Sequence, residues 1–480
     1  MGSNKTDLHI TDYLEANARR HPDKLAIDFE GRQISWGELW KEVNAKSGFF
    51  SNELGTDEQQ VVALLLTNSI DFVVAYLAVL YAGHIAMPLD PAYKKLELDA
   101  IVQQIKPRLV ITAERYIEQI GQTVPVILVN DIPKQKVLHE ILRFSPKRQI
   151  ASLIFTSGTS GKSKAVPNTH ANHIWNIQAC SDAWEWTNND TLLVNLPLSH
   201  MHGLTVCLTG VIYHANQMYL QQQSFDAEAV IKQLSSGRIS MFTHGPIAYE
   251  RLLKIEGKYD LSKVRVMICG SAPLPPRVWQ AFKDRFSVEI IETYGTSETL
   301  RIAGNRLGSK VPGSAGRPFE GVKIKLSADD ELLVKSPGVS PGYYRNSSAT
   351  KHALTKDGFW RTGDIAELHD GNVFLKGRIQ ERIRRFGYTV SPRDIEWALY
   401  KNPAVKEVFV MGRQIPEQPN DELVYFIATS LSSEEIKQYC KTNLLFAWRP
   451  DTIIRLDKLP RTRNGKASLP ALKRLAERQA

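Results

Sequence analysis

Short apolar runs alternate with helical segments along most of the chain, and this alternation constrains the fold more than any other feature. Residues 61–66 (VVALLL) form an unbroken apolar run typical of a strand buried on both faces, and residues 70–83 form an apolar helix after it. Similar strand patterns follow at 107–112, 124–130, 191–197, 239–244 and 264–268. Strands that alternate with helices are typical of βαβ units. The sequence therefore predicts an α/β fold with mostly parallel sheets.

The chain has 480 residues, more than one compact core usually holds, so two or more domains are expected. From about 305 to 376 helices become rare and short strands with Gly and Pro turns dominate, which indicates a small β-rich subdomain. A Gly-Arg pair and a polar connector then lead to a new helix start, with Ser391 at the cap and Pro392 at the first helical position. We therefore predict an N-terminal domain over residues 1–378 and a small α+β domain over 379–480.

Composition excludes several classes of protein. The longest apolar run without a charge, residues 72–83, is too short to span a bilayer, and the polar N-terminus lacks the apolar core of a signal peptide. The four cysteines are scattered without ligand spacing, so we expect a cytoplasmic protein without a structural zinc site. The net charge is +9, but basic and acidic residues are interspersed, which favours a solvated surface over a nucleic-acid interface. The oligomeric state stays open.

Small hydroxyl residues, glycines and lysines are concentrated in residues 153–170 (LIFTSGTSGKSKAVPNTH). Exposed backbone N–H groups, hydroxyls and lysines all favour a dense anion, so the segment indicates phosphate binding. Only two residues separate Gly158 from Gly161, whereas a Walker A loop needs four residues between its first Gly and its Gly-Lys pair. The loop therefore predicts a triphosphate site of another kind.

Further short motifs follow this loop in a fixed order. They are residues 269–276 (CGSAPLPP), 292–301 (ETYGTSETLR), 359–364 (FWRTGD), the pair Gly377-Arg378, and residues 459–469 (LPRTRNGKASL). Together with the first loop, they resemble the motifs of the adenylate-forming superfamily. That superfamily includes acyl- and aryl-CoA synthetases, the adenylation domains of peptide synthetases, and firefly luciferase. The resemblance covers nearly the whole chain.

The resemblance implies a fold and a reaction. The fold is a large N-terminal domain of two αβ subdomains and a β-barrel subdomain, joined by a hinge to a small, mobile α+β C-terminal domain. In the reaction, a carboxylate attacks the α-phosphate of ATP, which gives an acyl-adenylate and pyrophosphate, and a thiol then takes the acyl group. The implied cofactors are ATP, Mg²⁺ and CoA, or the phosphopantetheine of a separate carrier protein. Fixed donors and Mg²⁺ are needed because two anions must approach one another.

The same resemblance assigns the groups around the phosphates. The loop that wraps the β- and γ-phosphates consists of Thr156, Ser157, Gly158, Thr159, Ser160, Gly161 and Lys162, and Lys164 matches the second lysine of the motif. Glu298 matches the Mg²⁺ ligand. Lys466 matches the mobile catalytic lysine, which bridges the substrate carboxylate and the α-phosphate. Thr156 and His200 are the other expected catalytic residues.

The resemblance also assigns the residues that contact the adenine, the ribose and the α-phosphate. Tyr294 matches the aromatic residue that stacks on adenine, and Ser297 matches a hydroxyl near the α-phosphate. Asp364 and Arg378 match the groups that hold the ribose hydroxyls, a task that suits an acid accepting two hydrogen bonds. The remaining expected nucleotide contacts are Gly270, Ser271, Ala272, Pro273, Glu292, Thr293, Gly295 and Thr296.

Substrate choice is expected to depend on the segment after Pro197. Amino-acid-activating domains place an Asp there, whereas this chain has Ser199-His200, as acyl- and aryl-acid enzymes often do. The expected acyl pocket consists of His200, Met201, His202, Gly203 and Arg301. Arg301 is either a clamp for a second carboxylate or a surface residue. Malonyl-CoA synthetases tend to have an arginine where this chain has Thr293, so the acid stays open.

The acceptor thiol is also open. Gly387 and Tyr388 resemble the segment of CoA ligases that lines the pantetheine tunnel, which favours CoA, although a separate carrier protein uses the same tunnel. The expected hinge residue is Gln380, where the superfamily commonly has Asp or Lys. A third alternative is an inactive relative that only binds nucleotide. Retention of the expected active-site groups argues against it: Lys162, Glu298, Asp364, Arg378 and Lys466.

Overall fold

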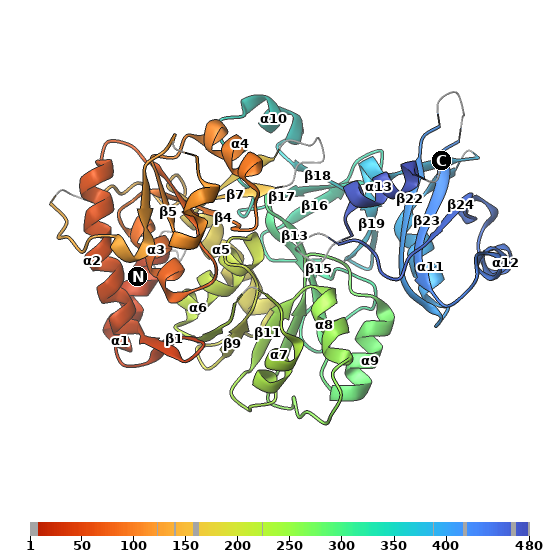
Figure 1. Ribbon diagram of the computed structural model, residues 1–480, viewed down its shortest axis with the longest axis horizontal. Coiled ribbons are helices and arrows are strands. Elements are labelled where there is room, and N and C mark those ends of the chain that lie inside the picture. Colours follow the sequence, from red (N-terminus) through yellow and green to blue (C-terminus); the bar gives the residue numbers. More distant parts are fainter. Residues whose placement is uncertain are drawn as a thin grey trace.

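The computed structural model describes most of the chain, and the structural statements below concern that part. The described residues are 8–121, 123–138, 141–156, 163–222, 224–386, 388–415, 420–461 and 467–478. Two large sheets and the helices around them form the left and lower parts of the molecule in Figure 1, and the C-terminal elements form a separate lobe on the right. None of the described helices combines the length and the hydropathy that a membrane span requires.

The first sheet has six strands in the order β6-β5-β3-β4-β7-β8, parallel except for the antiparallel pair of β7 and β8. Its strands are β3 (Val61–Leu65), β4 (Ile85–Leu89), β5 (Leu109–Thr112), β6 (Val126–Leu128), β7 (Ile150–Thr156) and β8 (Lys164–Thr169). The helices joined to it are α2 (Trp36–Leu54), α3 (Ile70–Tyr81), α4 (Lys95–Ile105) and α5 (His170–Trp184).

The second sheet has nine strands in the order β15-β14-β13-β12-β11-β9-β10-β1-β2. The run from β13 to β1 is parallel, and β2, β14 and β15 are antiparallel additions at its ends. Its strands are β1 (Leu25–Phe29), β2 (Arg32–Ser35), β9 (Thr191–Val194), β10 (Gln217–Leu220), β11 (Met241–His244), β12 (Val266–Cys269), β13 (Ile290–Thr296), β14 (Leu300–Gly304) and β15 (Arg317–Pro318). Its helices are α1 (Ile10–Arg20), α6 (Thr209–His214), α7 (Ala227–Leu234), α8 (Pro246–Leu253) and α9 (Pro276–Phe286).

The alternation of side chains along β3 explains the unbroken apolar run in the sequence. Val62 and Leu64 belong to the main core between the two sheets, whereas Val61, Ala63 and Leu65 belong to a second cluster that includes α4. Successive side chains of a strand point to opposite faces, so a strand covered on both faces needs apolar residues throughout. The predicted buried strand and its partner helix are thereby confirmed.

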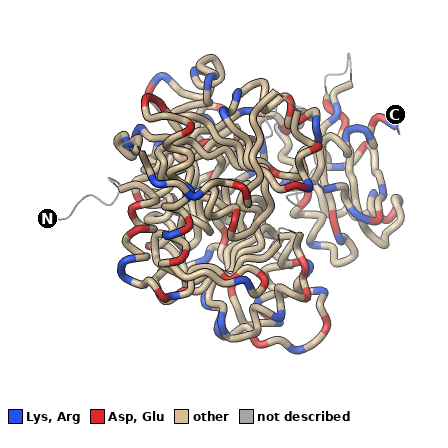
Figure 2. Tube along the Cα trace, turned by 60° about the vertical axis from the view of Figure 1, so that its left-hand side comes forward, with Lys and Arg blue, Asp and Glu red and all other residues tan. Residues whose placement is uncertain are grey.

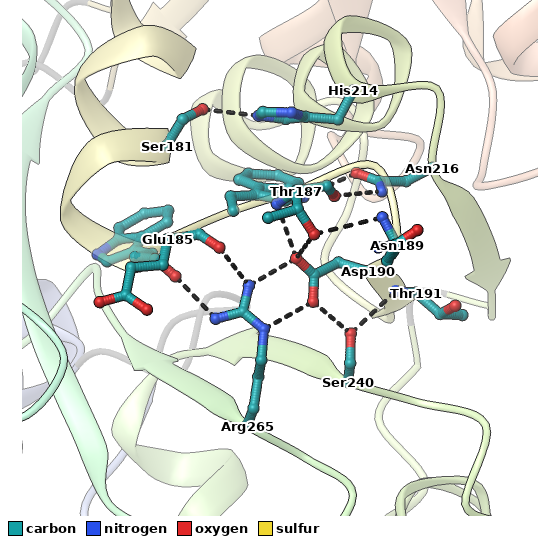
Figure 3. Close-up of polar contacts among 12 residues, drawn as sticks. Ser181, Glu185, Thr187, Asn189, Asp190, Thr191, His214, Asn216, Ser240 and Arg265 are labelled. Atoms are coloured by element: carbon teal, nitrogen blue, oxygen red, sulfur yellow. Dashed lines mark hydrogen bonds and ion pairs between the residues drawn. The ribbon is translucent and has the colours of Figure 1, made fainter.

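An ion pair between the buried Asp190 and the partly exposed Arg265 connects several elements of the second sheet. Asp190, Ser240 and Arg265 each directly precede a strand. Nε and Nη2 of Arg265 donate to the two carboxylate oxygens of Asp190 over 2.9 and 2.5 Å, and Ser240 Oγ donates to Asp190 Oδ1 over 2.7 Å (Figure 3). Arg265 also donates to the carbonyls of Trp184 and Glu185 at the end of α5. These bonds fix the entries to β9, β11 and β12, and hold the pKa of the Asp190 carboxyl below its usual value despite burial.

The remaining elements are two smaller groups. The four-stranded antiparallel sheet β16-β17-β18-β19 consists of β16 (Lys323–Leu326), β17 (Glu331–Lys335), β18 (Trp360–His369) and β19 (Asn372–Arg378), with α10 (Ser347–Ala353) beside it. The C-terminal lobe consists of β20 (Ile383–Arg385), β21 (Tyr388–Val390), α11 (Pro392–Tyr400), β22 (Val405–Arg413), β23 (Glu422–Thr429), α12 (Ser433–Asn443), β24 (Thr452–Arg455) and α13 (Leu469–Glu477). Its sheets pair only among themselves in the described residues.

Candidate active site

The expected nucleotide loops lie at the carboxyl ends of buried strands. Thr156 ends β7, the segment from Gly270 to Pro273 follows β12, and Thr293 to Thr296 form the end of β13, with Ser297 and Glu298 in the turn after it. Ligands of α/β proteins bind at this edge of a parallel sheet because the loops there converge. The two large sheets therefore present their loops in the way that a nucleotide site requires.

A first polar cluster joins Tyr294, Asp364 and Arg378, which come from β13, β18 and β19. The hydroxyl of Tyr294 donates to Oδ2 of Asp364 over 2.6 Å, and Nε of Arg378 lies 2.9 Å from Oδ1. Burial and the neighbouring carboxylate raise the pKa of Tyr294 well above its usual value, so its hydroxyl stays a donor. The structure thus brings together three residues that were expected around the nucleoside.

A second cluster lies at the two ends of the phosphate loop. Thr156 and Lys164 are opposite one another on β7 and β8, and Nζ of Lys164 lies 4.7 Å from the centre of the Tyr343 ring. The hydroxyl of Tyr343 donates to Oε1 of Glu298 over 3.0 Å. The expected lysine and the expected metal ligand are therefore linked through one tyrosine. The loop itself, residues 157–162, lies outside the described residues, so Ser157 through Lys162 stay predictions.

Glu292 of β13 anchors the loop after β12 through a hydrogen bond. Its Oε1 accepts a hydrogen bond from the backbone N–H of Leu274 over 3.1 Å, and its Oε2 lies 3.5 Å from Nζ of Lys310. Burial raises the pKa of Glu292 and lowers that of Lys310. The carboxyl of Glu292 is thus engaged with protein groups that position the loop, and a direct contact with the nucleotide stays a prediction.

Four of the expected acyl-pocket residues, His200 to Gly203, lie between β9 and the start of a π-helix (Gly203–Leu208), and the fifth, Arg301, lies on β14. Nε2 of His202 is 2.8 Å from Oγ1 of Thr243, and a Cβ at Gly270 would lie only 2.9 Å from Cε1 of His202 and 3.4 Å from Cγ2 of Thr293. Glycine at 270 therefore lets the loop after β12 approach the histidine. Burial lowers the pKa of His202 well below its usual value, so this imidazole stays neutral at pH 7.

Gly203 and His200 have distinct surroundings. A Cβ at Gly203 would lie 2.3 Å from the carbonyl oxygen of Pro197, so the turn into the π-helix requires glycine. Nε2 of His200 lies 3.4 Å from Oδ2 of Asp90, which directly follows β4. Met201 lies between these residues and is partly exposed. His200 therefore lies where the loops of the two sheets meet, and its role at the mouth of the acyl pocket stays a prediction.

Arg301 is buried, so the surface alternative for this residue is wrong. It lies on β14, opposite Gly295 of β13, and only 1% of its surface is exposed. A single arginine that follows a loop motif carries no signal of burial in the sequence, because the antiparallel return of β14 into the core depends on tertiary packing. The role of Arg301 in the expected acyl pocket stays a prediction.

The C-terminal residues are placed only in part. Lys466 and Gly387 lie outside the described residues, and for Tyr388 only the backbone, at the start of β21, is described. Gln380 is exposed in a short 3₁₀ turn (Ile379–Glu381) between β19 and β20. This is the connection between the four-stranded sheet and the C-terminal lobe, where a hinge would lie.

Four residues of the site were missed by sequence reasoning. Tyr343 bridges Lys164 and Glu298, Asp90 faces His200, Thr243 bonds to His202, and Lys310 pairs with Glu292. Of these, only Asp90 has a local sequence signal, because it lies in the segment AMPLDPAY, directly after the apolar residues of a strand. The others come from strands and loops without a motif, and their roles depend on which segments the fold brings together.

The donor set fits a magnesium ion that is held with phosphates rather than by protein alone. Among the described residues, no group of three or more His, Cys, Asp or Glu side chains could hold a metal ion. Mg²⁺ usually keeps several waters and binds through one or two carboxylates plus substrate phosphates. Glu298 would supply one such carboxylate, so the residues present fit this mode of binding.

Parallel sheets, nucleotide loops at their carboxyl edge and a separate C-terminal lobe define an α/β nucleotide-binding enzyme. The chain belongs to the AMP-binding enzyme family: the family's sequence model matches residues 14–344, and the model of the AMP-binding enzyme C-terminal domain matches residues 394–466. The resemblance drawn from the motifs is thereby confirmed.

The relatives match along nearly their whole length. The 2-succinylbenzoate–CoA ligase of Listeria monocytogenes is 29% identical over 475 residues, which cover 97% of this chain and 99% of that protein. The human mitochondrial malonate–CoA ligase is 26% identical, with coverage of 94% and 89%. Both relatives are CoA ligases by name.

Solved structures share the fold. ATP-bound MatB from Rhodopseudomonas palustris superposes with a TM-score of 0.90 at 24% identity, over 98% of this chain and 99% of that one. The o-succinylbenzoate CoA synthetase of Bacillus subtilis, in complex with its acyl-adenylate, gives 0.86 at 23% identity, over 96% and 97%. The expected fold class, a large N-terminal domain followed by a small C-terminal domain, is confirmed.

Proposed function

We propose that this protein is an AMP-forming acid–CoA ligase. The observation that carries the proposal is the convergence of two clusters, Tyr294–Asp364–Arg378 and Lys164–Tyr343–Glu298, at the loop edge of a fold that belongs to the AMP-binding enzyme family. One cluster suits a nucleoside and the other a triphosphate. An enzyme with both can activate a carboxylate through the α-phosphate of ATP.

In the first step, the carboxylate oxygen of the acid attacks the α-phosphorus, and pyrophosphate leaves. Asp364 accepts hydrogen bonds from the ribose hydroxyls, and Arg378 orients its carboxylate. Lys164 and the loop that precedes it neutralise the phosphates that leave. Glu298 would hold Mg²⁺, which would neutralise further negative charge on the phosphates. Lys466 is the proposed cation between the attacking carboxylate and the α-phosphate.

In the second step, the thiol sulfur of CoA attacks the acyl carbonyl carbon. A carbon–sulfur bond forms, the carbon–oxygen bond to the phosphate breaks, AMP leaves, and the thiol proton passes to solvent. Gly387 and Tyr388 are the proposed lining of the pantetheine path. Because Lys466 and this segment lie on the C-terminal side of Gln380, we propose that residues 379–480 rotate as a domain between the two steps.

CoA is the favoured acceptor because the relatives that match this chain along their whole length are named as CoA ligases. A separate carrier protein with phosphopantetheine is the second candidate, since the same pantetheine path would serve it. Nucleic acid is not a proposed partner: Lys and Arg are scattered among Asp and Glu along the chain (Figure 2). We propose the cytoplasm as the location, on the sequence features given above.

The test is acid-dependent turnover with and without CoA. The enzyme is incubated with ATP, Mg²⁺ and a panel of short, dicarboxylic, aromatic and medium-chain acids, and pyrophosphate and acyl-CoA are both measured. We expect CoA to stimulate pyrophosphate release while AMP and one acyl-CoA accumulate. Release that stops after a single turnover and ignores CoA would point to a carrier protein. Release with none of the acids would contradict the proposal.

A further inference from the structure

Arg301 is a buried cation with unused hydrogen-bond donors. Its backbone N–H donates to Oδ1 of Asn176 on α5 over 3.1 Å, but its side-chain Nε and Nη2 have no hydrogen-bond partner among the described residues. Buried polar groups are nearly always hydrogen-bonded, and a buried charge that is left unpaired is strongly destabilising. Such a group in a native fold calls for an explanation.

The residues around the guanidinium do not neutralise it. It interacts electrostatically with Cys180, to which it is also hydrogen-bonded, and with Cys207 and His202. Burial raises the pKa of each of these thiols to about 12, so both stay neutral at pH 7, and His202 is neutral as well. No carboxylate of the described chain lies within ion-pair distance of Arg301. The positive charge is therefore uncompensated by the protein groups whose positions are given.

A second arginine of the same molecule, Arg265, shows what the unpaired Nε–Nη2 edge of Arg301 can bind. Arg265 uses Nε and Nη2, the same two atoms, to hold both carboxylate oxygens of Asp190 (Figure 3). A guanidinium edge presents two parallel N–H groups whose spacing fits the two oxygens of a carboxylate. Arg301 presents this edge without an acid opposite it, so the group that fits is a carboxylate from outside the chain.

The guanidinium lies beside the expected acyl pocket. Arg301 is opposite Gly295 on β13, the strand that carries Thr293 and Tyr294. It acts electrostatically on His202, which is itself in contact range of the loop after β12. Cys207 belongs to the π-helix that begins at Gly203. Arg301 therefore lies next to both β13, which carries a nucleotide motif, and the π-helix of the expected acyl pocket.

We propose that Arg301 binds a second carboxylate of the substrate, so that the acid activated by this enzyme is a dicarboxylic acid. The inference rests on the proposed function and names the substrate class of its site. One carboxylate is activated at the α-phosphate, and the other pairs with the Nε–Nη2 edge. The two relatives described above point the same way, because 2-succinylbenzoate and malonate both carry two carboxylates. Arg301 is then a specificity-determining residue.

The pairing predicts strong discrimination. A monocarboxylic acid of equal length would leave the buried Nε–Nη2 edge of the guanidinium unpaired. Sites built to bond a polar substrate group reject analogues that lack it far more strongly than apolar pockets reject a missing methylene. We expect the kcat/KM for a dicarboxylic acid to exceed that of its matched monocarboxylic analogue by at least about 100-fold.

The experiment compares matched pairs of acids. Pyrophosphate release is measured with malonate through adipate and with 2-succinylbenzoate, each beside the analogue in which one carboxyl is replaced by a methyl group. Wild-type enzyme should prefer the dicarboxylic member of its best pair. Arg301→Met should abolish this preference, and Arg301→Lys, which keeps the charge but not the paired edge, should keep part of it. Arg306→Met, an exposed arginine shortly after the same strand, is the control.

Thermal unfolding supplies a readout that does not depend on turnover. Because Arg301→Met removes an unpaired buried charge and keeps an apolar side chain of similar length, the Tm of the substrate-free variant should rise. A fall in Tm would show that the guanidinium has partners within the protein and would overturn the inference.

The remaining outcomes separate this inference from the proposed function. Reaction of monocarboxylic acids alone, or a dicarboxylic preference that survives in Arg301→Met, would overturn the inference and leave acid activation standing. Absence of pyrophosphate release with every acid would contradict both.

Discussion

At the scale of single residues, the site depends on side chains that lie far apart in the sequence. The motifs were sufficient to predict Tyr294, Asp364 and Arg378 as neighbours of one nucleoside, and the structure links them directly. Tyr343 could not be predicted, because its contacts with Lys164 and Glu298 depend on how the segment before α10 folds back. The burial of Arg301 could not be predicted from the sequence either. Motifs therefore predict the residues that contact the ligand better than the residues that position those contacts.

Asp364→Asn tests the nucleoside cluster. The amide keeps the size of the side chain but loses the ion pair with Arg378 and one strong acceptor. Hydrogen bonds to charged groups contribute about 1.5–3 kcal/mol, so the KM for ATP should rise roughly 10- to 100-fold. Steady-state kinetics with varied ATP measure this, and Tyr294→Phe, which removes only one hydroxyl, should have the smaller effect. An unchanged KM for ATP in Asp364→Asn would remove this residue from the nucleotide site.

At the scale of helices and strands, the sequence predicted the parts that local chemistry determines. Residues 61–66 are a strand because both faces of β3 are covered, and α11 begins at Pro392 with Ser391 as its cap, whose Oγ accepts from the N–H of Asp394 over 3.3 Å. The order of strands in the sheets and the antiparallel return of β14 were not predicted. These depend on contacts between distant segments, which periodicity does not encode.

Arg265→Ala tests the ion pair that ties the strand entries together. The substitution leaves the buried carboxylate of Asp190 without its main partner, and it also frees the carbonyls of Trp184 and Glu185. Hydrogen bonds to a charged group contribute about 1.5–3 kcal/mol, and the Arg265 side chain is 34% exposed, so the cost stays below that of a fully buried pair. Chemical denaturation should show a loss of about 1.5–3 kcal/mol. As a control, Arg285→Ala, whose bonds go only to exposed backbone carbonyls, should cost clearly less.

Glu396 on α11 should make the stability of the C-terminal lobe depend on pH. Its Oε1 accepts from the N–H of Val410 over 2.9 Å, and burial raises the pKa of its carboxyl to about 8. The folded lobe therefore holds a proton that the unfolded chain releases near pH 4.5, so stability falls as the pH rises from about 4.5 to 8. The full shift in pKa corresponds to about 5 kcal/mol of unfolding free energy. The measured loss should be smaller, because the residue keeps some contact with solvent.

Glu396→Gln should remove this dependence. Amide hydrogen exchange in β22 and β23 reports on opening of the lobe, and the variant should be better protected than wild type at pH 8 but similar at pH 5. Equal pH profiles for the two proteins would show that the carboxyl is not protonated in the fold.

At the scale of the whole molecule, polar contacts join the two lobes in the part of the chain that the structure describes. Arg277 of α9 donates to the carbonyl of Lys406, and its guanidinium lies 5.0 Å from the centre of the Tyr400 ring. Near the expected hinge, Lys376 of β19 lies 3.3 Å from Asp394 of α11. A cleft of ≈ 590 Å³ separates α8 from the C-terminal lobe. Small, polar contacts of this kind permit domain rotation. The predicted boundary at 378 falls at the end of β19, and it stays a prediction.

The central claim is that the chain splits ATP between the α- and β-phosphates in order to activate an acid. Phosphorus NMR of the products, with the best acid of the panel and Mg²⁺, tests it most directly. We expect AMP and pyrophosphate that form only when acid is present, and almost none from Lys466→Ala, which should still form thioester from a supplied acyl-adenylate. ADP and inorganic phosphate, or AMP that forms without acid, would contradict the account.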